Sequence, residues 1–541
     1  MSNLYKYLSS KDNKLVDKVI SLVDIRKYDA AMDLIYQRLG EGIDIATQNG
    51  TMLKGELAGL LIDIGEEGLI EKATLNGLEI LETNRNEFIK HMREYSLEYN
   101  LGNGKRTLFK FQRSIPNFKF TAEAVSLLIE AKNHYWKAYK LLSYNDKPLK
   151  AQIFVNLANT LLQSGRIAEA LQYFDLVIIE NPDFSTALAN RSAALLRLTD
   201  ISGSYTTNLL QQAWKGYDSA ALDVDLPDWI AELFYRKGEW LKGKLEILGY
   251  NEDKINHDIE ETEAESKTHS NFRKYCIENH LTLSEHALYC NCVGARRDDL
   301  TIPSPVKPIG GEFVPQMELI LNRLKSEFAF ARLLYYQSKP NNFINLETFD
   351  REITFTELYE NEVVGNRSEM LRNSFRLCFG VLDKIAYGVC DLFDLAEPHE
   401  PLYFERFWKP RGKNLSIKKK ERWAKINSID NVPLLALYSQ ATDLNATDGE
   451  WSIFKKWRNA LEHEILILTL NDKKPLDKYK ILENQKDLDR VEYEEFEIKT
   501  LHMLRFTRSA IFNFVFCVRT EGAKVKSNGK VEPITFGYKK L

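Results

Sequence analysis

Three residues near position 460 carry the side chains that cleavage of a phosphodiester without a metal ion requires. Arg458 and Asn459 are followed by His463, so a fixed cation, an amide and an imidazole fall within about one and a half helical turns. Histidine moves protons near neutral pH, and arginine holds phosphate oxygens while charge develops on them. The group predicts a catalytic site for RNA cleavage, provided that a folded element positions the three side chains.

The spacing of these residues limits how they can act together. Asn459 and His463 are four residues apart and share one face of a helix. Arg458 and His463 are five residues apart, which is about 140° around the helix axis. Arg458 also borders the apolar face, so the spacing favours a seam between two copies of the helix. The alternative is that Arg458 pairs with Glu462 and that His463 is an ordinary surface residue.

The element that carries the three residues is predicted as a helix over residues 451–470. Thr447 and Glu450 form a capping box before it. One apolar stripe then runs along it through Phe454, Trp457, Leu461, Ile465 and Leu468. Further amphipathic helices are predicted over residues 317–336, 368–395 and 497–520. Together they predict a helical bundle over residues 311–541, with a basic insertion at about 396–446.

The first half of the chain, residues 1–245, is predicted to be a solenoid of helical repeats. In residues 151–184, Ala158 and Ala170 fall where two helices would approach closely, and Gly165 falls at the turn between them. Aromatic residues fill the expected gaps, and Pro182 ends the second helix. This spacing resembles a tetratricopeptide repeat, and weaker copies flank it. The resemblance implies a protein or peptide ligand for the solenoid.

Residues 246–310 are predicted to be a polar linker and boundary segment. Its first part is mostly acidic, and three prolines precede the bundle. The segment also holds residue types that bind zinc, namely Cys276, His280, His286, Cys290 and Cys292. No Cys-x-x-Cys pair occurs among them, so buried thiols and surface histidines are the alternative. We therefore assign no metal ligand, and zinc binding at 276–292 stays open.

A basic stretch at residues 404–425 lies inside the predicted bundle domain. Cations follow phosphates and aromatic rings stack on unpaired bases, so the stretch predicts contact with RNA. The alternative is a solvated loop whose aromatic residues pack on the bundle. The candidate RNA-binding residues are Arg406, Trp408, Lys409, Arg411, Lys413, Lys418, Lys419, Lys420 and Arg422.

Composition restricts the classes of protein to which the chain can belong. A net charge of −4 provides no general attraction to nucleic acid, so RNA binding would need a local patch. No apolar run is long enough to span a bilayer, no signal peptide is evident, and six cysteines make no disulfide framework. We expect a cytoplasmic protein without a membrane partner. The chain lacks phosphate-binding glycine loops, so we expect no cofactor.

The Arg458, Asn459 and His463 pattern, late in a predicted four-helix bundle, resembles the HEPN superfamily. The resemblance covers about residues 311–525 and implies a homodimer through the C-terminal bundle, with the two motifs forming one metal-independent endoribonuclease site. It also implies a role as a toxin or antiviral-defence effector. The family's pattern is an arginine followed by four to six residues and then a histidine, which Arg85 with His91 and Arg273 with His280 also fit. Only Arg458 with His463 lies in an apolar bundle helix.

We therefore expect an all-α protein with two parts, a repeat solenoid that regulates and a HEPN-like bundle that cleaves RNA. His463 would act as general base or acid, Arg458 would neutralise phosphate charge, and Asn459 would hydrogen-bond phosphate or orient His463. Asp383 is a weaker acidic candidate. The alternative function is a non-catalytic repeat-containing scaffold, or an RNA-binding protein whose bundle only dimerises.

Overall fold

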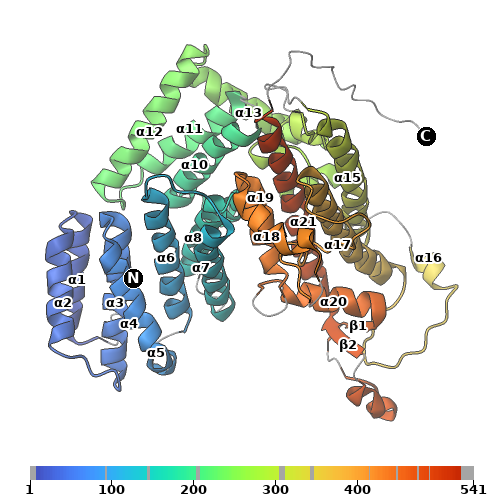
Figure 1. The fold of residues 1–541 in the computed structure, drawn as a ribbon, viewed down its shortest axis with the longest axis horizontal. Coiled ribbons are helices and arrows are strands. Elements are labelled where there is room, and N and C mark those ends of the chain that lie inside the picture. Colours follow the sequence, from blue (N-terminus) through green and yellow to red (C-terminus); the bar gives the residue numbers. More distant parts are fainter. Residues whose placement is uncertain are drawn as a thin grey trace. The chain divides into compact units, whose positions relative to one another are not determined.

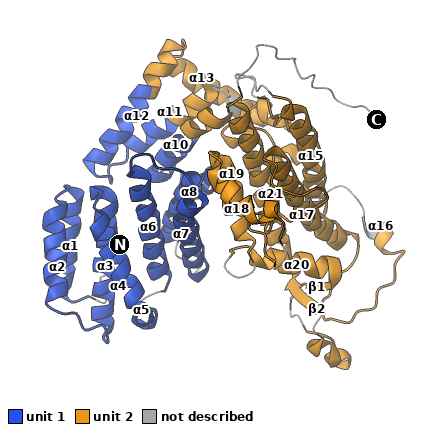
Figure 2. Ribbon diagram, viewed as in Figure 1, with its two compact units in different colours: residues 1–194, 214–240 blue, residues 195–213, 241–541 orange. Residues whose placement is uncertain are grey.

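The computed structural model is built almost entirely of helices, which confirms the all-α prediction (Figure 1). The chain forms two compact units: residues 1–194 with 214–240, and residues 195–213 with 241–541 (Figure 2). The structure describes residues 8–91, 94–142, 147–202, 207–303, 311–340, 346–412, 415–445, 449–471, 474–485 and 488–525. Among these residues, no helix is both long enough and apolar enough to span a bilayer.

The first unit consists of consecutive helices that pack mainly against their neighbours in sequence. They are α1 (Ser10–Asp24), α2 (Tyr28–Gly40), α3 (Gln48–Gly68), α4 (Glu71–Thr83), α5 (Arg85–His91), α6 (Glu94–Ser114), α7 (Ala122–Leu141), α8 (Lys147–Gln163) and α9 (Ile167–Glu180). The boundary between the units falls inside α10 (Ser185–Ser202), α11 (Thr207–Ala221) and α12 (Asp228–Ile247).

The pair α8 and α9 shows why the sequence folds in this way. Ala158 and Ala170 are fully buried where the two helices meet. Gly165 adopts a φ of +85° in the turn, a conformation that glycine adopts without strain. Arg166 and Glu169 then form a buried ion pair of 2.7 Å at the start of α9. This packing between sequence neighbours is consistent with helical repeats.

A network of polar side chains joins four helices of the first unit. Arg106 of α6 pairs with Glu66 of α3 at 2.7 Å, and the hydroxyl of Tyr135 on α7 donates to Asn103 of α6. Asn156 of α8 also donates to Asn103, over 3.0 Å. Because these groups satisfy one another, the network fixes the register of successive helices.

The second unit is centred on long helices that share one core. Its elements are α13 (Glu252–Ser266), α14 (Asn271–Glu278), α15 (Phe313–Gln337), α16 (Leu346–Asp350), α17 (Asn366–Leu392), α18 (Ile417–Ser428), α19 (Val432–Asp443), α20 (Ser452–His463), β1 (Ile465–Thr469), β2 (Leu488–Glu492) and α21 (Tyr493–Gly522). Helices α15, α17 and α21 pack on one another, and α20 packs on α17. This arrangement provides the predicted bundle (Figure 1).

The helix predicted over residues 451–470 is wrong in its second half, because α20 ends at His463. Residues 465–469 form strand β1 instead, parallel to β2, with Ile465 opposite Leu488. A short run of isoleucine, leucine and threonine favours an extended backbone once a partner strand is available. Ile465, assigned to the apolar stripe, is 58% exposed. Thr447 of the predicted capping box lies outside the described residues.

The stretch predicted as a linker, residues 246–310, packs on the bundle within the second unit. Arg332 of α15 forms a buried ion pair with Asp298, and Arg508 of α21 donates to the carbonyl of Thr282 over 2.8 Å. Arg519 of α21 likewise donates to the carbonyl of Ile302, over 3.0 Å. The arginines that anchor this stretch lie far away in sequence, so its own polar composition gave no sign of them.

The predicted insertion at about 396–446 also contributes to the core. Helix α19 buries Leu434 and Leu437, and its Gln440 accepts a hydrogen bond of 2.9 Å from Asn513 of α21. Only the part before α19 is therefore an addition to the bundle.

Candidate active site

Helix α20 is oriented by a cluster of aromatic rings. Phe454 and Trp457 on its buried face lie 5.7 and 6.2 Å, between ring centroids, from Phe375 of α17. Trp457 also lies 5.3 Å from Phe496 of α21. Burial of this face fixes the rotation of α20, which turns Arg458, Asn459 and His463 away from the core.

Arg458 lies half-buried between α20 and the chain that follows α17. Its guanidinium lies 5.9 Å from the ring centroid of Phe379 and 6.0 Å from that of Tyr403. Aromatic faces attract a cation at such distances and hold the long side chain in place. Tyr403 is 40% exposed, so it forms an accessible wall beside the guanidinium.

An acidic group lies beneath Arg458. The pKa of Asp383 on α17 is raised to about 6, mainly by burial and also by the charge of the nearby Glu405. The backbone N–H of Phe404, which donates to Asp383 over 2.9 Å, and the charge of Arg458 act in the opposite direction. Glu405 is held by Lys455 of α20 at 3.0 Å. Asp383 therefore anchors the segment that carries Tyr403.

His463 is the last residue of α20 and is exposed. Within the described part of the chain, its ring has no hydrogen-bond partner. Arg376 of α17 donates to the carbonyl of Leu461 and lies 3.8 Å from the carboxylate of Glu462. A cation at this position satisfies the last carbonyls of the helix and interacts favourably with its dipole. Arg376 thus fixes the turn that presents His463.

These contacts bear on the alternative that Arg458 is merely the ion-pair partner of Glu462. Among the described residues, the ion pair recorded for Glu462 is with Arg376. Arg458 faces Tyr403 and Phe379 instead. The three predicted residues therefore share the outer part of one short helix, with Arg458 and Asn459 half-buried and His463 exposed.

Sequence reasoning missed Tyr403 and Arg376. The first follows α17 by many residues, and the second lies about ninety residues before His463, so helical spacing could not associate them with the motif. The only available signal was that Arg372 and Arg376 occupy one face of an otherwise apolar helix. Arg372 donates to the carbonyl of Leu466, so both arginines hold the junction between α20 and β1.

Two of the candidate RNA-binding residues are buried, which leaves them no surface for RNA. Trp408 is 2% exposed, and its indole N–H donates to the carbonyl of Phe404 over 2.8 Å. Arg422 is 1% exposed, pairs with Glu400 at 2.7 Å and donates to two backbone carbonyls. Both residues stabilise the fold of the basic segment, as the alternative interpretation expected for its aromatic rings.

The other cations of the segment differ in their surroundings. Lys418 and Lys419 form ion pairs with Asp394 and Glu400, and Lys409 lies 3.8 Å above the ring of Trp423. Arg406, Arg411 and Lys420 are exposed, and Lys413 lies outside the described residues.

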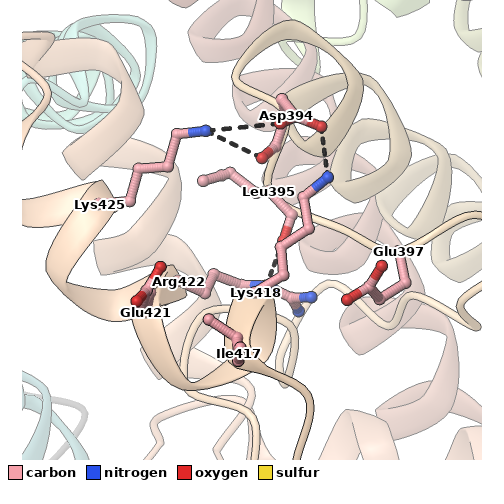
Figure 3. Close-up of a pocket in the computed structure, with 8 residues that line it drawn as sticks. All are labelled: Asp394, Leu395, Glu397, Ile417, Lys418, Glu421, Arg422 and Lys425. Carbon is pink, nitrogen blue, oxygen red and sulfur yellow. Dashed lines mark hydrogen bonds and ion pairs between the residues drawn. The ribbon is translucent and has the colours of Figure 1, made fainter.

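A cavity of about 570 Å³ lies between the segment that follows α17, at residues 394–397, and α18 (Figure 3). At the edge of the cavity, Asp394 forms ion pairs with Lys418 and Lys425, as Figure 3 shows. Acidic side chains line it beside the lysines, at Asp394, Glu397 and Glu421. Because these charges offset one another, the cavity offers no concentrated positive site for a phosphate.

The arginines of the other two Arg–His pairs that fit the same permissive pattern have structural partners. Arg85 forms an ion pair with the fully buried Glu98, and Arg273 lies 3.4 Å from Asp298. His280 adopts a φ of +55° just after α14 rather than lying on a helix with Arg273. Neither pair forms a face comparable to that of α20.

Residues 310–521 match a family model described as LA2681-like HEPN, so a HEPN-family domain occupies the part of the chain from α15 to α21. HEPN domains are commonly ribonucleases. No tetratricopeptide family is detected in the N-terminal region. No curated protein matches the chain.

Proposed function

We propose that the protein is a metal-independent endoribonuclease whose active site is formed by Arg458, Asn459 and His463. The observation that carries the proposal is the position of His463, which is exposed at the end of α20 inside a HEPN-family domain. An unpaired imidazole on a rigid element is available to move protons, and a guanidinium five residues earlier is available to bind phosphate.

The chemistry follows from these groups. His463 removes the proton from a ribose 2′-hydroxyl, and the resulting oxygen attacks the adjacent phosphorus. Arg458 neutralises the charge that develops on the phosphate oxygens. The bond to the 5′-oxygen then breaks, and an imidazolium returns a proton to that leaving oxygen. The products are a 2′,3′-cyclic phosphate and a 5′-hydroxyl end.

One His463 cannot act as base and acid in the same step, so a second copy of α20 is expected to supply the second imidazole. This favours a homodimer in which two α20 helices face each other. The half-buried position of Arg458 between Tyr403 and Phe379 supports this arrangement, because such a guanidinium is held in a fixed direction.

Substrate RNA is expected to approach along the exposed cations of the basic segment. The exposed Arg411 and Lys420 are available for phosphates, and Arg406 is exposed although it also pairs with Glu405 at 3.4 Å. The accessible ring of Tyr403 offers a face for an unpaired base. The segment adjoins the proposed site because Glu405 contacts Lys455 of α20.

The N-terminal helices are proposed to regulate the nuclease by binding a protein or peptide. An RNase that is always active would harm its own cell, which fits a toxin or antiviral-defence effector that is released by a trigger. Helices that pack mainly on sequence neighbours form extended surfaces suited to such ligands.

The test is incubation of the purified full-length protein with total RNA in EDTA, beside the His463→Ala variant. Cleavage by the wild type alone, leaving cyclic phosphate ends, is the expected result. Equal cleavage by both proteins contradicts the assignment of His463. If neither protein cleaves, equal toxicity of the wild type and of the Arg458→Ala and His463→Ala variants in cells would favour a non-catalytic scaffold.

A further inference from the structure

A second group of chemically active side chains lies in the second unit, around residues 286–294. The backbone N–H of Cys292 donates to Sγ of Cys290 over 3.2 Å, and the side chain of His286 forms a hydrogen bond with Cys292. A methyl group added at Gly294 would lie 3.1 Å from Cγ of His286 and 3.2 Å from Sγ of Cys292. The imidazole of His286 and the sulfur of Cys292 therefore lie on the same side of Gly294, and Cys290 lies two residues before Cys292.

The hydrogen bonds around Cys292 favour its thiolate form. The pKa of Cys292 is lowered to about 4, first by the hydrogen bond from Cys290 and then by those from His286 and the backbone N–H of Gly294, against the effect of burial. The hydrogen bond to Cys292 in turn raises the pKa of His286, and the carboxylates of Asp299 and Glu285 raise it further. At neutral pH Cys292 is thus a thiolate, and its neighbour His286 is shifted toward the protonated form.

Other cysteines in the described part of the chain contrast with this pair. Cys276, Cys378, Cys390 and Cys517 are buried, and burial raises the pKa of each thiol. Cys292 is only partly buried. A reagent in solution therefore meets one cysteine that is both accessible and ionised.

Neighbouring elements hold the loop that carries these residues. Glu265 of α13 accepts a hydrogen bond of 2.9 Å from the N–H of Val293, and the imidazole of His269 bonds to the carbonyl of Asn291 over 2.9 Å. Asn208 of α11 donates to Sγ of Cys290 over 3.5 Å. Because these contacts hold the backbone on both sides of Cys292, the pair does not depend on a mobile loop.

A metal site explains the arrangement less well. Among the described residues, the group of three potential ligands whose atoms converge is His257, Asp258 and Glu261, on the surface of α13. The ligand atoms of His286, Cys290 and Cys292 do not converge in this way, and Cys290 already accepts two N–H donors. The contacts suit a reactive thiolate with a second thiol beside it.

We propose that Cys292 is a site of thiol oxidation by hydroperoxides, with His286 as proton donor and Cys290 as the resolving thiol. The Cys292 thiolate attacks one oxygen of hydrogen peroxide, the O–O bond breaks, and the departing hydroxide takes a proton from the His286 imidazolium to form water. Cys292 becomes a sulfenic acid. The sulfur of Cys290 then displaces hydroxide from it, which leaves a disulfide and a second water formed with the Cys290 proton.

Alkylation of the full-length protein by iodoacetamide, followed residue by residue with mass spectrometry, tests the thiolate. A thiol of ordinary pKa loses about tenfold in rate per pH unit below about pH 8, whereas Cys292 is expected to change less than about threefold between pH 8 and pH 5. The His286→Gln variant is expected to show a steeper dependence than the wild type, because one of the hydrogen bonds that stabilise the thiolate is lost. A wild-type Cys292 that reacts like a free thiol at every pH overturns the proposal.

Treatment with hydrogen peroxide tests the oxidation itself. The Cys290→Ser variant is expected to trap a sulfenic acid that dimedone labels at Cys292, and the wild type is expected to form a disulfide between Cys290 and Cys292. The Cys378→Ser variant is the matched control and should behave as the wild type does. Absence of both products, or stoichiometric zinc that blocks alkylation until a chelator removes it, overturns the proposal in favour of an inert or metal-binding cluster.

Discussion

Helix α20 and the basic segment at 404–425 belong to one unit, and both carry polar or charged side chains close to aromatic rings. They differ in which of these side chains are buried and which are exposed. On α20 the rings of Phe454 and Trp457 are buried, and the chain shows His463 to solvent. In the basic segment one of the cations, Arg422, is buried, where it contacts Glu400 and backbone carbonyls.

The difference shows that a charged residue in the sequence can be assigned to the surface only if the fold places no hydrogen-bond acceptors around it in the interior. Arg422 has an acidic partner and two carbonyls in reach, so burying the guanidinium costs little. His463 lies at a helix end where Arg376 already donates to the carbonyl of Leu461, and among the described residues its ring has no hydrogen-bond partner. The comparison leads to four predictions, given from the largest expected effect to the smallest.

Replacing His463 with alanine is expected to slow RNA cleavage by about 10²- to 10⁴-fold, because the group that transfers the proton is lost. The free energy of unfolding should change by less than about 0.5 kcal/mol, since the side chain is exposed. Cleavage rates and urea unfolding measure both quantities. The control is His257→Ala, which removes another exposed helical histidine. Equal losses of activity in the two variants would contradict the assignment.

Replacing Arg422 with alanine is expected to lower the free energy of unfolding by about 3 kcal/mol, because the carbonyls of Leu395 and Phe407 would lose their buried donor and Glu400 would lose its closer partner. Urea unfolding followed by tryptophan fluorescence measures this loss. The matched control is Arg411→Ala, an exposed change in the same segment, which should cost less than about 0.5 kcal/mol. An Arg422→Ala protein of unchanged stability would remove the distinction between the two regions.

The pH dependence of stability is expected to reflect Asp383, which accepts a hydrogen bond from the segment that carries Tyr403. Since burial raises its pKa to about 6 from an ordinary value of about 4, the native state keeps a proton that the unfolded chain releases between these values. Stability therefore falls as pH rises through this window, by about 1 kcal/mol after allowance for partial exposure.

The Asp383→Asn variant keeps an acceptor for the N–H of Phe404 without the charge. We expect it to be more stable than the wild type above about pH 6 and equally stable near pH 4, as thermal unfolding across this range will show. A variant that is less stable at every pH would mean that the carboxylate stabilises Arg458 more than its burial costs.

The exposed cations of the basic segment should give the smallest effect. Changing Arg411 and Lys420 together to alanine is expected to weaken RNA binding several-fold and to reduce the salt dependence of affinity by about 0.7 per lost contact. Binding to single-stranded RNA at several salt concentrations measures both. Lys418→Ala is the control, because Lys418 pairs with Asp394. A greater loss from the control would place the RNA along the cavity of Figure 3 instead.

Local patterns predicted the helices well, because period and turn residues act within a few positions. The helix predicted over residues 317–336 corresponds to α15, and Gly165 occupies the turn that its position indicated. The end of α20 could not be predicted in this way. Ile465 and Leu468 fit a helical stripe as well as a strand, and only the distant β2 decides between them.

The site was predictable to the same extent. Arg458, Asn459 and His463 lie on one helix, so their spacing alone associates them. Arg376 and Tyr403 reach α20 from α17 and from the segment after it, which no local pattern reveals. The burial of Arg422 could not be predicted for the same reason, since its partner Glu400 lies 22 residues earlier and outside the basic segment.

The parallel pairing of β1 and β2 has a practical consequence for engineering. The chain must cross from the end of one strand to the start of the other, and the crossover includes Asp477–Asn484, a stretch without a buried side chain. For a flexible connection, the free energy of closing the loop rises by only about 0.6 kcal/mol for each doubling of its length. We therefore expect the fold to tolerate a fluorescent or affinity tag inserted in this connection. The tag would lie close to His463 in sequence and would leave the aromatic cluster that orients α20 unchanged.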